Sequence, residues 1–156
     1  KIEGRTKSIY YVSRTAQIYR HAINDAVAGR KFDPTLIGKL DNLANRGYTD
    51  GFYQRHPTQE QQNYIQGYSS SEQQQYVGEI TSYDETTKSL NIAVKNRFSL
   101  GDKLEFILPE GNIEFTLEKL LNKEGKLIDV APGSGHHVKI PYAGSVPEKG
   151  LLARYN

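Results

Sequence analysis

The sequence contains no cysteine, no methionine and no long apolar run. Without cysteine the 156-residue chain has no disulfide, no thiolate ligand for zinc or an iron–sulfur cluster, and no thiol nucleophile. No apolar stretch approaches the roughly 20 residues of a membrane-spanning helix, and no signal-peptide pattern is present. Because the chain begins at Lys1 rather than Met, we expect a fragment or processed form of a longer cytoplasmic protein with no membrane partner.

The sequence also has little excess of either charge, because 20 Lys and Arg residues nearly balance 18 Asp and Glu residues and leave a net charge of +2. A charge this small does not by itself indicate a nucleic-acid partner. The length suffices for one domain with a sizeable core or for two small domains. Composition alone therefore indicates a globular protein with a polar surface.

Two helices are predicted in the first part of the chain. Ser8 is placed to cap the first, and Gly29 stands where a left-handed residue ends a helix. Asp33 and Pro34 form a second start signal, with Pro34 at the first helical position. Apolar residues recur at steps of three and four. The expected stripes are Val12, Ala16, Tyr19, Ala22, Ile23 and Ala26 in the first helix, and Leu36, Ile37, Leu40 and Leu43 in the second.

The amino-acid composition changes at residues 47–75, which are rich in Gly, Gln, Ser and Tyr and have no helical period. Such a composition is typical of a loop or linker. The segment carries too many aromatic rings for a free linker, so we expect an extended segment held by its rings against a neighbouring surface. These rings are Tyr48, Phe52, Tyr53, Tyr64 and Tyr68.

From Tyr76 onward the apolar pattern has a period of two, in short runs separated by turn residues. Evenly spaced short strands favour a small antiparallel β-barrel of six or seven strands. We therefore predict an α+β protein with a helical part and linker at residues 1–75 and a β-barrel domain at residues 76–156. The expected strands are YVGEITSY, SLNIAVK, KLEFILP, IEFTLEKL, KLIDVA, HHVKIPY and GLLARY.

Two stretches resemble a known family. "KIEGRTKSIYYVSRTAQIYRHAIND", with "LANRGYTDGFY" downstream, resembles the U32 peptidase family and within it the bacterial branch that hydroxylates tRNA. "YVGEITSYDETTKSLNIAVKNRFSLGDKLEFILPEGN" resembles that family's C-terminal domain. This domain is in turn similar to domain 2 of elongation factor Tu, where the pattern F-x-x-G-D-x-L precedes a strand. Ile2–Arg5 also spells a factor Xa cleavage sequence, but the likeness continues through Ser8, so we interpret these residues as native.

The resemblance implies a function for the whole parent protein: prephenate-dependent 5-hydroxylation of the wobble uridine of tRNA. It implies that Lys1–Arg5 closes a TIM-like barrel whose remainder, with cysteines holding an iron–sulfur cluster, lies upstream. The helices would then buttress that catalytic barrel and the β-barrel would help to position tRNA, while this chain alone would be inactive. Two alternatives remain open: an accessory protein-binding module of a collagenase-like peptidase, and a purely structural domain.

Glu3, Arg5 and Lys7 are the candidate edge of the upstream active site. They alternate along an expected extended segment, so their side chains would point one way. TIM barrels build active sites at the carboxyl ends of their strands. Arg5 would then hold a carboxylate or phosphate through paired hydrogen bonds. The alternative is an ordinary surface ion cluster.

Six basic residues are candidates for binding RNA. Basic side chains interleaved with tyrosines offer both phosphate neutralisation and ring stacking. The alternatives are a solvated helix face, tyrosines packed in a core and simple loop charge. The candidates are Arg14, Arg20, Arg46 and Arg55 in the helical part, and Lys95 and Arg97 in the β part.

Other motifs predict no chemistry. His136 and His137 are adjacent on an expected strand and so point to opposite faces, which argues against a shared metal ion. Gly133–Gly135 lacks the Lys-Ser/Thr and helix of a phosphate loop. His21 and His56 have no accompanying Ser–Asp pattern. We therefore expect neither a metal site nor a serine protease centre in this chain.

Overall fold

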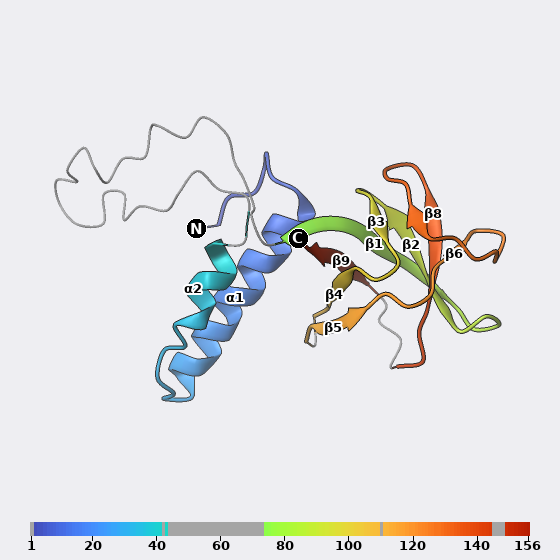
Figure 1. Cartoon of the computed structure of the whole chain (residues 1–156). Coiled ribbons are helices and arrows are strands. Elements are labelled where there is room, and N and C mark those ends of the chain that lie inside the picture. Colours follow the sequence, from blue (N-terminus) through green and yellow to red (C-terminus); the bar gives the residue numbers. More distant parts are fainter. Residues whose placement is uncertain (1, 42, 44–73, 110, 145–148) are drawn as a thin grey trace. The chain divides into compact units, whose positions relative to one another are not determined.

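The computed structural model describes residues 2–41, 43, 74–109, 111–144 and 149–156 (Figure 1). The chain divides into two compact units, Lys1–Glu72 and Gln73–Asn156, here called the helical unit and the sheet unit. The predicted ring-bearing segment, with Tyr48, Phe52, Tyr53, Tyr64 and Tyr68, lies outside the described residues. Each unit is therefore considered by itself.

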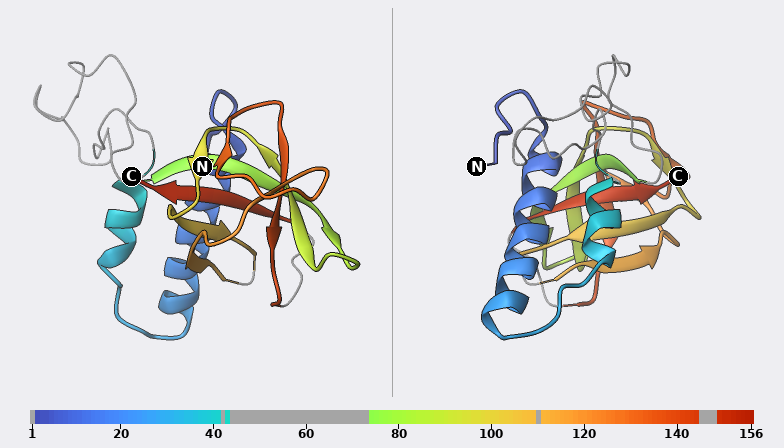
Figure 2. Two further views of the ribbon diagram at one scale, coloured as in Figure 1. Left: turned by 45° about the vertical axis from the view of Figure 1, so that its right-hand side comes forward. Right: turned by 90° about the vertical axis from the view of Figure 1, so that its left-hand side faces the viewer.

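The helical unit contains the two predicted helices, α1 (Ile9–Val27) and α2 (Thr35–Asp41), which lie side by side (Figure 2). The Ser8 hydroxyl caps α1 by accepting a hydrogen bond from the Tyr11 amide at 3.3 Å. Gly29 adopts the left-handed conformation, with φ 68°. Asp33 Oδ1 accepts from the Thr35 amide at 2.9 Å, so α2 begins one residue after Pro34.

The buried face of α1 is not the predicted stripe. Tyr10, Arg14 and Ile18 are 5–6% exposed, whereas Tyr19 and Ile23 are about half exposed, at 51% and 50%. The buried side of the helix also carries a polar network around Asp25. Arg30 follows the Gly29 turn and pairs with the buried Asp25 at 2.6 Å, and His21 Nε2 lies 3.3 Å from the other oxygen of that carboxylate. In the stripe predicted on α2, Leu36 and Leu43 are buried, but Ile37 is 53% exposed.

The sheet unit is a curled antiparallel half-barrel, as Figures 1 and 2 show. Its main sheet has seven strands in the order β5-β4-β9-β1-β2-β8-β6, and β3 pairs separately with β7. This arrangement confirms the predicted α+β class, although the similarity to elongation factor Tu stays a prediction. The strands are β1 (Gln74–Asp84), β2 (Ser89–Val94), β3 (Phe98–Ser99), β4 (Lys103–Ile107), β5 (Ile113–Thr116), β6 (Leu121–Asn122), β7 (Val130–Ala131), β8 (His137–Pro141) and β9 (Gly150–Tyr155).

Alternating apolar residues of these strands fill one core, which the curl of the sheet encloses. Phe106 stacks on Phe115 with ring centroids 4.7 Å apart and meets the edge of Tyr142 at 5.7 Å. The register of β1 shifts between Tyr76 and Gly78 and again between Ile80 and Ser82, and such bulges bend a strand. The core residues include Val77, Ile80, Leu90, Ile92, Val94, Phe98, Leu104, Phe106, Leu117, Leu120, Val138, Ile140 and Leu152.

The motif Phe98-Ser99-Leu100-Gly101-Asp102 builds the turn between β3 and β4. Phe98 is fully buried, and Gly101 has φ 85°, which side chains rarely adopt. Asp102 Oδ2 accepts a hydrogen bond from the Ser99 amide at 2.8 Å. The conformations of these residues explain the F-x-x-G-D-x-L pattern as a structural requirement rather than as a catalytic one.

Candidate nucleic-acid interface

The predicted catalytic edge does not form an extended segment here. The Lys7 amide donates to the Gly4 carbonyl at 2.9 Å, which closes a turn around Arg5. The extended, one-sided arrangement expected for Glu3, Arg5 and Lys7 is therefore wrong for this structure. A barrel strand needs neighbouring strands to pair with, and described residues 2–8 have none. A role for these three residues at an active site stays a prediction.

The basic candidates of the helical unit differ in their access to solvent. Arg14 is only 5% exposed, which does not fit the phosphate contact predicted for it. Arg20 is exposed on α1 and stays a candidate. Arg46 and Arg55 lie outside the described residues.

In the sheet unit, the loop between β2 and β3 holds Lys95 and Arg97 in a fixed position. The Lys95 amide donates to the Val77 carbonyl at 2.8 Å, and Asn96 Nδ2 donates to the Tyr76 carbonyl at 2.7 Å. These bonds fasten the loop to β1. Arg97 is exposed, and no ion pair is found for it within the described ranges.

The Lys95 ammonium lies next to an acidic group. Its Nζ is 3.4 Å from Glu79 Oε1, and the same oxygen accepts a hydrogen bond from the Tyr76 hydroxyl. Burial and this hydrogen bond to Glu79 raise the pKa of Tyr76 far above the usual tyrosine value of 10.0. The phenol therefore stays neutral and helps to hold Glu79 in place.

Arg154, which was not among the predicted residues, bonds to the loop that carries Lys95 and Arg97. Its Nη1 donates to the Arg97 carbonyl at 3.4 Å, and its Nη2 donates to Gln75 Oε1 at 3.1 Å. The signal for it was a single cation in the apolar strand GLLARY, two residues after the buried Leu152 and so on the same face of β9. We call Lys95, Arg97 and Arg154 the basic cluster.

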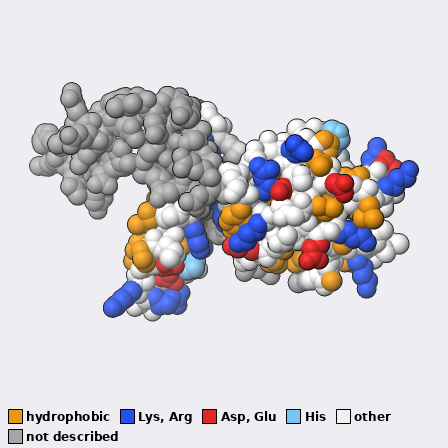
Figure 3. Space-filling model, viewed as in Figure 1, with side chains coloured by type: hydrophobic (Ala, Val, Ile, Leu, Met, Phe, Trp, Pro, Cys, Tyr) orange, Lys and Arg blue, Asp and Glu red, His pale blue; other side chains and the backbone are white. Residues whose placement is uncertain are grey.

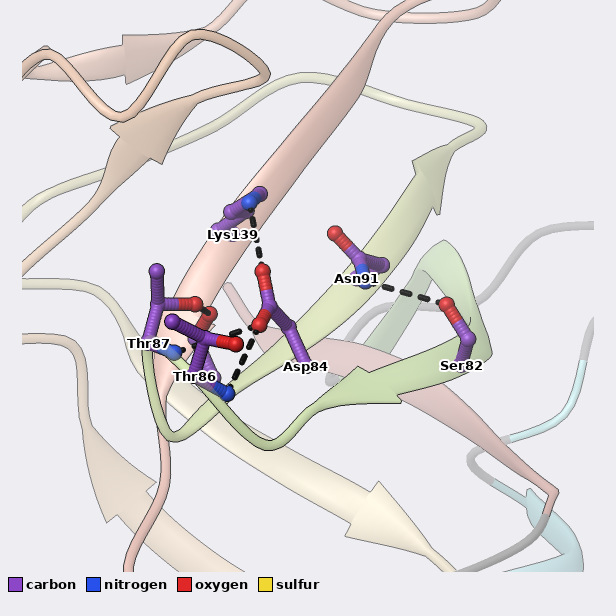
Figure 4. A network of polar contacts seen from close by, with 7 residues as sticks. Ser82, Asp84, Thr86, Thr87, Asn91 and Lys139 are labelled. Atoms are coloured by element: carbon purple, nitrogen blue, oxygen red, sulfur yellow. Dashed lines mark hydrogen bonds and ion pairs between the residues drawn. The ribbon is translucent and has the colours of Figure 1, made fainter.

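A second polar network closes the β1–β2 hairpin (Figure 4). Asp84 Oδ1 accepts from the amides of Thr86 and Thr87 at 3.0 and 3.1 Å, and its Oδ2 accepts from Lys139 Nζ at 2.9 Å. The hydrogen bond from Lys139, followed by those from Thr87, holds the pKa of Asp84 well below its usual value of 3.8. Both oxygens of this carboxylate accept hydrogen bonds that hold the hairpin turn and join it to β8, so its role is structural.

Glu105 is a buried carboxylate, 4% exposed. Its Oε2 accepts from Gln74 Nε2 at 2.5 Å, and its Oε1 accepts from Asn112 Nδ2 at 2.7 Å. The amide donors on both oxygens satisfy the polar atoms of this buried side chain. The residue links the start of β1 to β4 and to the turn before β5.

The described residues include no candidate metal site and no candidate membrane-spanning helix. Among the residues that the structure describes, no three His, Asp or Glu side chains lie together as a metal site would require. Because the whole chain lacks cysteine, it has no thiolate with which to hold the implied iron–sulfur cluster. Neither described helix is both long and apolar enough to span a membrane. Figure 3 shows Lys and Arg interspersed with Asp and Glu over the visible face of the sheet unit.

Comparison with known proteins places both units. Residues 72–154 match the family described as "Peptidase family U32 C-terminal domain", and residues 1–63 match "Peptidase family U32". The C-terminal domain of a Geobacillus thermoleovorans protein described as a U32 peptidase aligns in structure with a TM-score of 0.47 and 26% identity. That alignment covers 52% of this chain and 92% of the domain.

Three relatives carry functional names. The "tRNA hydroxylation protein P" of Haemophilus influenzae is 54% identical over 138 residues, 88% of this chain and 30% of its own length. The Escherichia coli protein of that name is 53% identical over 141 residues, 90% of this chain and 31% of its own. An uncharacterized protease of Methanocaldococcus jannaschii is 32% identical over 111 residues, 69% of this chain and 27% of its own. The chain thus spans less than a third of these relatives, and it belongs to peptidase family U32.

Proposed function

We propose that this chain is the C-terminal, non-catalytic portion of a U32 enzyme that hydroxylates tRNA. The observation that carries the proposal is the identity of 53–54% with two proteins named for tRNA hydroxylation, over 88–90% of the chain. On this proposal the reaction is the prephenate-dependent 5-hydroxylation of the wobble uridine. The helical unit buttresses the rest of the enzyme and the sheet unit helps to position the tRNA.

The reacting centre belongs to the part of the enzyme outside this chain. An iron–sulfur cluster there would supply the redox chemistry and would need ligands that a chain without cysteine does not have. The carboxylates of Asp84 and Glu105 are engaged in structural hydrogen bonds. The contribution of this chain is therefore binding and orientation.

The exposed face of α1 supports the buttressing role. Apolar residues Ile9, Val12, Tyr19 and Ile23 are 38–56% exposed, and they follow one another at steps of three, seven and four. Ala16 and Ala26 continue the same line. Such spacing gives one continuous seam along a helix about 28 Å long. We propose that this seam packs against the portion of the U32 enzyme that the longer relatives have outside the matched region.

A second candidate function follows from the relative described as a protease. In that case the chain would be an accessory module that binds protein substrates. The lower identity, 32% against 53–54%, favours tRNA hydroxylation.

A chimera distinguishes the two candidates. This chain replaces the matched region of the Escherichia coli relative, in a strain that lacks that relative. We expect mass spectrometry of tRNA nucleosides to show 5-hydroxyuridine restored, and we expect the purified chimera to leave denatured collagen uncut. Cleavage of collagen without hydroxylation would establish the peptidase function instead. The 156-residue chain alone should be inactive in both assays.

A further inference from the structure

The charge of Arg154 is poorly matched by its protein partners. The nearest carboxylate oxygen, Asp102 Oδ2, is 3.9 Å from its Nη1 and already accepts from the Ser99 amide at 2.8 Å. Strong charge-assisted bonds between a guanidinium and an anion measure about 2.7–2.9 Å. The three hydrogen bonds that Arg154 donates are longer, at 3.1–3.4 Å, and go to neutral oxygens. Its Nε is buried and has no hydrogen-bond partner among the described residues.

The second arginine of the basic cluster is held beside the first. The Arg97 carbonyl accepts from Arg154 Nη1, so the loop that carries one cation is bonded to the head group of the other. The loop itself is fixed to β1 through the amides of Lys95 and Asn96. The head group of Arg154 is thus joined to this loop by a bond to a backbone carbonyl and not by a close carboxylate, so an anion bound beside it would meet a poorly matched charge.

We propose that the basic cluster is a phosphate-binding surface for the RNA backbone, with Arg154 as a central contact that the sequence alone did not reveal. This inference rests on the proposed function, because it assigns the tRNA contact of the sheet unit to these residues. A planar guanidinium matches two phosphate oxygens at once, which suits Arg154 and Arg97. Lys95, with a 39% exposed side chain, adds a further cation at the edge, partly neutralised by Glu79 at 3.4 Å.

The chemistry of the surface predicts weak binding that depends on salt and not on base sequence. The cluster offers cations for about two or three phosphates, so the slope of log affinity on log salt should be about −1.4 to −2.1. Affinity for the isolated chain should be micromolar or weaker at physiological salt. The remainder of the enzyme would supply the rest of the affinity for tRNA.

The test is a titration of fluorescently labelled tRNA transcript with the full 156-residue chain, by fluorescence anisotropy at two salt concentrations. The variants are Arg97→Gln and Arg154→Gln. The matched control is Lys123→Gln, whose side chain is 75% exposed on the β6–β7 turn. Each cluster variant should raise the Kd about three- to tenfold and flatten the salt slope by about 0.7, whereas the control should match the wild type.

Two further variants, Arg154→Lys and Arg20→Gln, test the geometry of the contact and its location. Arg154→Lys retains the charge but loses the fork, so it should bind between the wild type and Arg154→Gln. Arg97 is on the surface, so Arg97→Gln tests the cluster even if Arg154→Gln fails to fold. Unchanged binding by both cluster variants, with weakened binding by Arg20→Gln, would move the RNA contact to the helical unit and overturn the inference. No binding at low salt would overturn it too.

These failures differ from a failure of the proposed function. The proposed function fails if the chimera does not hydroxylate tRNA, whatever the chain binds. The inference fails if the cluster variants bind tRNA as the wild type does, even in a chimera that hydroxylates tRNA.

Discussion

Arg154 and Arg97 lie 57 residues apart in the sequence, yet the guanidinium of Arg154 donates to the backbone carbonyl of Arg97 at 3.4 Å. This bond fastens the guanidinium of Arg154 to the loop between β2 and β3, which carries the exposed Arg97. Binding surfaces often carry positive charge that the ligand and not the protein neutralises.

Removing the charge of Arg97 should weaken RNA binding without lowering the stability of the fold. Arg97 is exposed, so Arg97→Gln should change the free energy of unfolding by less than about 0.5 kcal/mol. The urea denaturation midpoint measures this. A fall of more than about 1 kcal/mol would show that Arg97 is a structural residue and not part of a binding surface.

The hairpin carboxylate gives a prediction for pH. Because the hydrogen bonds from Lys139 and Thr87 favour the ionised form, the pKa of Asp84 is lowered from its usual 3.8. Its contribution to stability is fully present above pH 3.8 and is lost as the pH falls through the lower pKa of the folded state. Asp84→Asn should therefore lower the thermal midpoint at neutral pH, and the difference from wild type should shrink in acid. Glu85→Gln, at the next position of the turn, is the control, and an equal loss at every pH would refute this assignment.

The core of the sheet unit gives a prediction of stability. Phe98 is fully buried where β3 meets β7, so Phe98→Ala should cost about 3–5 kcal/mol of unfolding free energy. Leu127→Ala, at a side chain 71% exposed, should change it by less than about 0.5 kcal/mol. Chemical denaturation followed by far-ultraviolet circular dichroism compares the two. Equal losses would mean that Phe98 does not anchor this core.

The seam on α1 predicts different results in different contexts. In the isolated chain, Ile23→Ser should change unfolding free energy by less than about 0.5 kcal/mol, because Ile23 is 50% exposed. In the chimera the same substitution should reduce the yield of folded enzyme and its hydroxylation of tRNA, since there the seam is covered. Asn24→Ser, an exposed polar position on the same helix, should have neither effect. Normal yield and activity of the Ile23→Ser chimera would remove the seam from the interface.

Local signals in the sequence were sufficient for most elements. Ser8, Gly29 and Asp33 marked the helix ends because capping depends on a few neighbouring residues. Alternating apolar residues likewise located β1, β2, β4, β8 and β9. The two-residue strands β3 and β6 were missed, because pairs that short carry no periodicity.

Burial and long-range contacts were harder to predict. In the stripe predicted on α1, Tyr19 and Ile23 are about half exposed, whereas Arg14 and Asp25 on another side of the helix are buried. A periodic apolar pattern shows that one face of a helix must pack against something. It does not show which surface covers that face. Arg154 was missed for a related reason: only the pairing of β9 with β1 and β4 brings it to the loop of Arg97.

The most direct test of the account is the wobble hydroxylation supported by the chimera with and without the sheet unit. We predict that the chimera carrying this chain restores 5-hydroxyuridine, and that the same chimera ending before Tyr76 loses most of it while remaining folded. Full hydroxylation by the truncated chimera would contradict a role for the sheet unit in tRNA positioning. A folded full-length chimera with no 5-hydroxyuridine would contradict the assignment to tRNA hydroxylation altogether.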